Sequence, residues 1–241
     1  MSTSALMGRA TRVRHWLKMN ARSHSASAAL IDLLFGPVTM GTIIGPRLLK
    51  FGAYVVIVTE PKQPRMPNGI ESDVRIRASA SLAIGRGRLA IGSVALTPGP
   101  AWNPVPELTA VRSLPPGPEP VESALAALGA DPSTSEDLLA GYIAGLVLLH
   151  GLRDRAGRIA ERAAALANPL HATLLGHAAR GEVPEPVHAL LGQRDPGPLL
   201  AFGGASGHRW LRGLVSAGLP LESWLSTVGS PITLPLVDSH A

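Results

Sequence analysis

Residues 136–152 read EDLLAGYIAGLVLLHGL, and this stretch decides the fold of the second half of the chain. Its apolar residues recur at steps of three and four, which places them on one face of an α-helix. Acidic residues begin the stretch, where the positive end of a helix dipole favours them. We therefore expect a helix whose apolar face lies in the core. That face consists of Leu138, Leu139, Tyr142, Ile143, Leu146, Leu149 and Leu152.

Other windows with helical periodicity lie on both sides of this stretch. Together with residues 136–152 they predict a helical bundle in the C-terminal half of the chain. The windows span residues 121–128, 154–167, 170–180, 186–191, 208–217 and 221–228.

The N-terminal half has a different pattern, in which short β-branched runs alternate with glycines. Gly85-Arg86-Gly87 is a three-residue connection of the kind that closes a β-hairpin. The expected fold class is therefore α+β, with a β-rich N-terminal half followed by an α-helical C-terminal half. The expected strands span residues 38–44, 54–59, 69–76, 81–84 and 88–96.

Prolines separate the two halves, because residues 97–120 hold too many of them for a helix interior or a central strand. Residues 1–27, rich in Ser, Ala and Arg, are expected to form a flexible basic arm. One domain is expected over residues 28–241. It divides into a β-rich lobe at 28–103, a proline-rich bridge at 104–120 and a helical lobe at 121–241.

The net charge of +5 belongs to the N-terminal arm. Five basic residues precede the first acid, Asp32, which leaves 17 basic and 17 acidic residues in the rest of the chain. A nucleic-acid-binding surface needs a basic stripe with interleaved aromatics, so we expect no nucleic-acid partner. The chain has no cysteine, which excludes disulfides, thiolate metal sites and a cysteine nucleophile.

The apolar runs of the chain are shorter than the roughly 20 residues that a membrane-spanning helix needs, or polar residues interrupt them. The N-terminal arm lacks the apolar core of a signal peptide. We therefore expect a cytoplasmic protein with no membrane partner.

The first candidate site is the segment Asp131-Pro132-Ser133-Thr134-Ser135-Glu136-Asp137. Ser133 and Glu136 have the spacing of a capping box, which explains the segment as a helix start alone. The alternative is an anion site at the helix N-terminus, with Thr134 and Ser135 as ligands of the anion. Glu136 and Asp137 would then bind Mg²⁺ or move a proton.

The second candidate site is Phe202-Gly203-Gly204-Ala205-Ser206-Gly207, which leads directly into an expected helix. Glycines at a helix start let backbone N–H groups approach an anion, and Ser206 could both cap the helix and donate to a ligand. The segment is neither a Walker loop nor a dinucleotide fingerprint. The alternative is a loop that packs tightly between helices.

Residues 66–69 and the histidines are two further features of the sequence. Met66-Pro67-Asn68-Gly69 has the composition of a turn between strands. The histidines, which include His171 and His177, lack the spacing of a metal site, and no cofactor follows from the sequence beyond a possible Mg²⁺.

Taken in order, these motifs resemble the AllH family, which supplies one subunit of the three-part oxamate carbamoyltransferase of purine (allantoin) catabolism. The family segment Gly-Asp-Asp-Phe-Leu-x-Gly resembles residues 135–141, with Ser135 in place of Gly and Glu136 in place of the first Asp. Its Leu-Ser-x-x-Leu-Leu and Ala-x-Gly segments resemble residues 170–175 and 179–181. Its Gly-x-x-Ser-Gly resembles residues 203–207, and a Pro-Asn-Gly turn corresponds to residues 67–69.

The resemblance implies a bacterial subunit of a carbamoyltransferase-type complex that acts on a small anionic substrate such as carbamoyl phosphate or oxalurate. It implies Glu136 and Asp137 as the catalytic pair. The changes at residues 135 and 136 leave open a second reading, in which the chain is a non-catalytic AllH-like scaffold of such a complex. The substrate-binding residues expected in the first reading are Asn68, Gly69, Thr134, Ser135, Gly204, Ser206 and Gly207.

Overall fold

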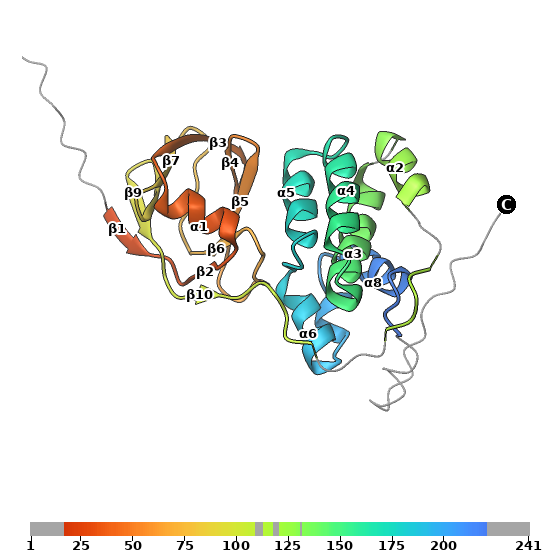
Figure 1. Ribbon diagram of the computed structural model, residues 1–241. Coiled ribbons are helices and arrows are strands. Elements are labelled where there is room, and N and C mark those ends of the chain that lie inside the picture. Colours follow the sequence, from red (N-terminus) through yellow and green to blue (C-terminus); the bar gives the residue numbers. More distant parts are fainter. Residues whose placement is uncertain (1–16, 109–112, 118–120, 131, 221–241) are drawn as a thin grey trace, which may run out of the picture.

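Two lobes lie side by side, and the proline-rich segment connects them (Figure 1). The computed structural model describes residues 17–108, 113–117, 121–130 and 132–220. A curled mixed sheet makes up the N-terminal lobe and helices make up the C-terminal lobe, so the fold class is α+β as predicted. The helix expected at residues 221–228 lies outside the described residues.

The sheet has ten strands among the described residues, in the order β1-β9-β8-β7-β3-β4-β5-β6-β2-β10. Helix α1 (Ala28–Phe35) packs against this sheet and buries Leu30 and Leu34 in the core of the lobe. The strands are β1 Leu17–Asn20, β2 Ser23–Ser25, β3 Thr39–Gly45, β4 Leu48–Phe51, β5 Tyr54–Thr59, β6 Gly69–Glu71, β7 Leu82–Gly85, β8 Arg88–Ile91, β9 Val94–Thr97 and β10 Ala101–Trp102.

The predicted hairpin is confirmed, although its connection is shorter than expected. Gly85 pairs with Arg88, so only Arg86 and Gly87 form the loop between β7 and β8. Both have positive φ, at 52° and 73°. Two left-handed residues in a two-residue loop match the right-handed twist of the flanking strands.

Two other expectations about strands were wrong. Residues 88–96 form two antiparallel strands, because Gly92, at φ 60°, turns the chain after β8. Residues 17–25, which we assigned to the flexible arm, contain β1 and β2, and β1 pairs in parallel with β9. These pairings join segments far apart in the sequence, so local composition does not predict them.

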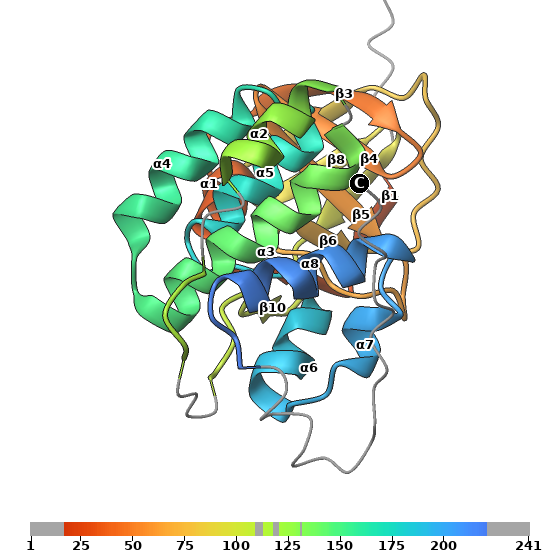
Figure 2. The same ribbon diagram turned by 90° about the vertical axis from the view of Figure 1, so that its right-hand side faces the viewer.

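The helical lobe is built around α3, which the other helices surround (Figure 2). The predicted apolar face is confirmed in part. Leu139, Tyr142, Ile143 and Leu146 are fully buried, whereas Leu152 is 39% exposed. The helix begins at Pro132 and ends at His150, two residues before Leu152. The helices are α2 Val121–Ala130, α3 Pro132–His150, α4 Arg153–Ala164, α5 Pro169–Ala178, α6 Glu185–Gln193, α7 Gly197–Leu200 and α8 Ala205–Ser216.

Helices α3 and α8 approach each other so closely that their contact requires glycine. A β-carbon on Gly141 would collide with the backbone oxygen of Trp210, and one on Gly213 would collide with the backbone oxygen of Leu138. A β-carbon on Gly145 would overlap that of Ala217. Small residues at these positions therefore set the distance between the two helices.

A buried polar network joins the two lobes. The Tyr54 hydroxyl on β5 lies 2.9 Å from Nε2 of His177 on α5, and Nδ1 of the same ring lies 2.6 Å from Glu182. Burial lowers the pKa of His177, so its neutral ring donates to Glu182 and accepts the Tyr54 proton. Burial alone would raise the pKa of Glu182, but the hydrogen bonds from His177 and Arg180 outweigh it and lower this pKa.

We predict that Gly141→Ala lowers the free energy of unfolding by about 1–3 kcal/mol, because the added methyl group forces α3 and α8 apart. This loss should exceed the gain of up to about 1 kcal/mol that alanine brings to a helix interior. Urea unfolding followed by circular dichroism measures the difference.

Gly157→Ala on α4 is the matched control, since a β-carbon there meets nothing within 4 Å. It should raise the free energy of unfolding by about 0.5–1 kcal/mol. Equal stabilisation by both substitutions would contradict a close contact between α3 and α8.

Candidate functional site

Three helix starts meet in the helical lobe and bring polar side chains together. The second turn of α3 supplies Glu136 and Asp137, the start of α5 supplies Asn168 and His171, and the first turn of α8 supplies Ser206. We call these five residues the helix-start cluster. Free backbone N–H groups and positive dipole ends gather where helices begin, so this arrangement suits an anion.

Asp137 joins α3 to α8. The Ser206 hydroxyl donates a hydrogen bond of 2.5 Å to Oδ2 of Asp137. The Arg209 guanidinium, one turn further along α8, lies 3.8 Å from the same oxygen. This hydrogen bond places Asp137 of α3 beside Ser206 of α8. Asp137 is almost fully buried, so its charge depends on these two partners.

Glu136 points toward α5 instead. Its Oε1 lies 3.4 Å from both the backbone nitrogen and the side-chain Nδ2 of Asn168. Its Oε2 lies 2.5 Å from Nδ1 of His171, and the Glu136 residue is only 1% exposed. The two groups are in close contact, although Oε2 makes no hydrogen bond among the described residues.

The tautomer of His171 follows from Asn168. Its Oδ1 caps α5 by accepting from the backbone N–H groups of Leu170 and His171, so its Nδ2 is the atom that faces His171 Nδ1, at 2.7 Å. Nδ1 therefore accepts the hydrogen bond from Asn168, and the neutral ring carries its proton on Nε2.

The electrostatics of the pair agree with this assignment. Burial, with a smaller contribution from the charge of Asp137, raises the pKa of Glu136 to about 7, although the hydrogen bond from the Asn168 backbone N–H opposes the shift. Burial lowers the pKa of His171. Burial thus favours the neutral form of both groups, a carboxylic acid beside an imidazole.

The capping box predicted for Ser133 and Glu136 is wrong. Because α3 begins at Pro132, Ser133 lies inside the helix, and the Glu136 side chain turns to α5. Ser135 is buried in the first turn. Thr134 belongs to α3, but its side chain lies outside the described residues.

The glycine-rich segment is explained by backbone geometry and packing. Gly203 and Gly204 have φ of 56° and 62°, and Gly204 is the N-cap of α8. Ser206 therefore lies inside the helix and does not cap it, contrary to expectation. A β-carbon on Gly207 would collide with the backbone oxygen of Leu199, so this glycine allows α8 to pack against α7.

Asn68 and Gly69 lie in the other lobe, in the confirmed turn before β6. Gly69 N–H bonds to the Met66 carbonyl, and Asn68 Nδ2 donates to the Val55 carbonyl at 2.7 Å. Among the described residues, no hydrogen bond joins Asn68 to the helix-start cluster. Its amide holds the strand β5 in place, which is a structural role.

Glu136 and Asp137 do not converge on one point, because one faces α5 and the other faces α8. Within the described part of the chain, no group of three or more His, Asp or Glu side chains could hold a metal ion. Each carboxyl group instead accepts hydrogen bonds, Glu136 from Asn168 and Asp137 from Ser206.

Sequence reasoning missed Asn168 and His171. Asn168-Pro169 is a helix-start signal in its own right, with an N-cap followed by proline at the first helical position. This signal could have placed a third helix start near the expected site. The contact of His171 with Glu136 depends on how α5 packs against α3, which local sequence does not encode.

Comparison with protein-family models, with curated proteins and with solved structures finds no match for this chain. In the described ranges, every helix is too short or too polar to cross a membrane.

We predict that the Ser206 and Asp137 side chains are energetically coupled. A double-mutant cycle of Ser206→Ala and Asp137→Asn should give a coupling energy of about 1–3 kcal/mol, the range for hydrogen bonds to charged groups. Urea unfolding of the four proteins measures it. Additive effects of the two substitutions would show that the hydrogen bond is absent.

The raised pKa of Glu136 makes a second prediction, for the pH dependence of stability. Because the folded pKa of about 7 lies above the ordinary 4.5, this carboxyl stabilises the fold fully below pH 4.5 and loses that effect as the pH rises through 7. The stability of the wild type minus that of Glu136→Gln should therefore fall between pH 4.5 and 8.

A difference that stays constant with pH would mean that Glu136 has an ordinary pKa.

Proposed function

We propose that this protein is an AllH-like, cytoplasmic subunit of a carbamoyltransferase-type complex that acts on a small anionic substrate of the carbamoyl phosphate or oxalurate class. The observation that supports the proposal is the contact of Glu136 with His171, 2.5 Å between Oε2 and Nδ1, near the starts of three helices. The resemblance of residues 135–141 and 203–207 to the AllH family supplies the substrate class.

In this proposal the helix starts bind the anion. The positive dipole ends of α5 and α8 lower the energy of a carboxylate or phosphate, and the nearby Arg209 adds a positive charge. Carbamoyl transfer depends on charge neutralisation and alignment, and a site made of fixed dipoles provides both.

The pair of Glu136 and His171 handles the proton. When phosphate displaces the nitrogen of oxalurate, the carbon–nitrogen bond breaks, a carbon–oxygen bond to phosphate forms, and the departing nitrogen takes up a proton. His171 donates this proton from Nε2 while Nδ1 accepts the proton of Glu136. Glu136 ends the step as a carboxylate. A proton from water then returns to Nε2, and Nδ1 gives its proton back to Glu136.

A scaffold role in the same complex is the second candidate. The observation that favours it is that both carboxyl groups already have protein partners, Ser206 for Asp137 and Asn168 for Glu136. Residues satisfied in this way can serve stability alone. In that case the surface of the lobes would bind the other subunits, and the chemistry would belong to them.

The test measures carbamoyl phosphate formation by the purified protein together with the products of its neighbouring genes. We expect Glu136→Gln to lower the rate about 100-fold or more, because glutamine cannot pass a proton to His171. Glu161→Gln, an exposed carboxyl change on α4, is the matched control and should leave the rate unchanged.

Unchanged activity in the Glu136→Gln, Asp137→Asn double variant would reject the catalytic role. If that variant still assembles with the other subunits and the complex remains active, the scaffold role is supported. Failure of the wild-type protein to bind any of those subunits in pull-down assays would reject both roles.

A further inference from the structure

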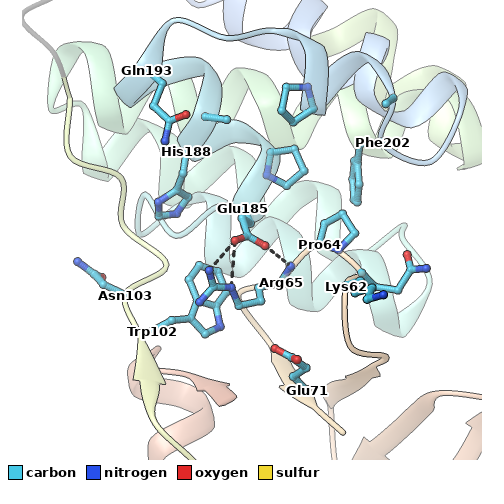
Figure 3. Close-up of a pocket in the computed structure, with 15 residues that line it drawn as sticks. Lys62, Pro64, Arg65, Glu71, Trp102, Asn103, Glu185, His188, Gln193 and Phe202 are labelled. Atoms are coloured by element: carbon cyan, nitrogen blue, oxygen red, sulfur yellow. Dashed lines mark hydrogen bonds and ion pairs between the residues drawn. The ribbon is translucent and has the colours of Figure 1, made fainter. Parts of the chain in front are cut away.

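A cleft of about 850 Å³ opens between the two lobes, away from the helix-start cluster (Figure 3). The loop between β5 and β6 forms one side, α6 forms another, and β10 and the segment before α8 complete it. Its volume lies within the roughly 300–1,000 Å³ of small-molecule sites, which often occur where two lobes meet. Its residues play no part in the function proposed above.

Arg65 is fixed in this cleft. Its Nε and Nη2 donate to Oε1 of Glu185 at 3.1 and 2.6 Å, and its backbone N–H donates to Oε2 at 3.0 Å. Its guanidinium lies over the ring of Trp102, 5.5 Å from the centroid. Nη1 has no partner among the described residues, and the side chain is 39% exposed. The cleft therefore contains a preorganised donor for a carboxylate.

Two further charged side chains, Glu71 and Lys62, line the cleft. Glu71, on β6, accepts from the Ser23 hydroxyl through Oε2, and its Oε1 has no partner in the described part of the chain. Lys62 belongs to the loop between β5 and β6 that lines the cleft. Its backbone has the left-handed conformation, with φ at 73°, which is uncommon for lysine. Since Glu185 neutralises Arg65, the cleft presents one positive and one negative group beyond that pair.

Apolar side chains form the rest of the lining. Trp102 and Phe202 stand on different sides of the cleft (Figure 3), and the prolines at positions 64, 186 and 198 also line it. His188 packs edge-on against Trp102, with ring centroids 5.6 Å apart, and so fixes its orientation. Flat rings and prolines provide a rigid surface for a flat apolar group.

We propose that this cleft binds a free α-amino acid with an aromatic side chain. The carboxylate bonds to Arg65 and Lys62, the ammonium group bonds to Glu71, and the ring lies between Trp102 and Phe202. A simple organic anion fits less well because it would meet the carboxylates of Glu71 and Glu185 without neutralising either. A simple amine would leave Arg65 Nη1 and Lys62 without a partner.

The proposal is tested with three probes of the same size on the full-length protein. L-Phenylalanine has both charges, 3-phenylpropanoate lacks the ammonium group, and 2-phenylethylamine lacks the carboxylate. Isothermal titration calorimetry should show saturable binding of L-phenylalanine. The other two probes should bind with dissociation constants at least about tenfold higher. The fluorescence of Trp102 should change on binding, and Trp102→Phe should remove that change.

Glu71→Gln separates the role of the ammonium group from mere hydrophobic binding. This variant should bind L-phenylalanine and 3-phenylpropanoate with similar affinity, while Glu161→Gln on α4 should keep the preference of the wild type. Circular dichroism confirms that each variant is folded. Absence of saturable L-phenylalanine binding to the folded protein would overturn the site, and equal wild-type affinity for 3-phenylpropanoate would overturn the ligand class.

Discussion

The close contact of α3 with α8 is the constraint on which the rest of the helical lobe depends. Three glycines allow the two backbones to touch, and the distance between these helices leaves no room for a β-carbon at Gly141 or Gly213. With α3 and α8 held at this distance, the first turn of α8 lies against the second turn of α3. Asp137 then meets Ser206, and the adjacent Glu136 is left to face α5.

The same contact explains why the site is electrostatically unusual. Glu136 is buried in the helical lobe, so its charged form loses its hydration by water. The protein therefore keeps this carboxyl protonated close to neutral pH and places it against His171. A group that can gain or lose a proton near pH 7 is suited to acid–base chemistry, whereas an exposed glutamate would be ionised.

How much the sequence predicts depends on the range of each interaction. The periodicity of Leu139, Tyr142 and Leu146 predicts α3, and Arg86-Gly87 predicts a hairpin, because both signals act within a few residues. The parallel pairing of β1 with β9 and the contact of His171 with Glu136 join residues far apart in the chain. Gly141 and Gly207 stood in motifs thought to approach a ligand, and the structure shows that they approach other helices.

The central claim is that the second turn of α3, at Asp137, lies against the first turn of α8, at Ser206. Because the chain has no cysteine, two introduced cysteines test this claim directly. Cysteines replace Asp137 and Ser206, and a short reagent that fluoresces only when it bridges two neighbouring thiols is added to the folded protein. The account predicts rapid bridging for this pair and none when the second cysteine replaces Ser79, in the β-rich lobe. No bridging of residues 137 and 206 in a folded protein would contradict it.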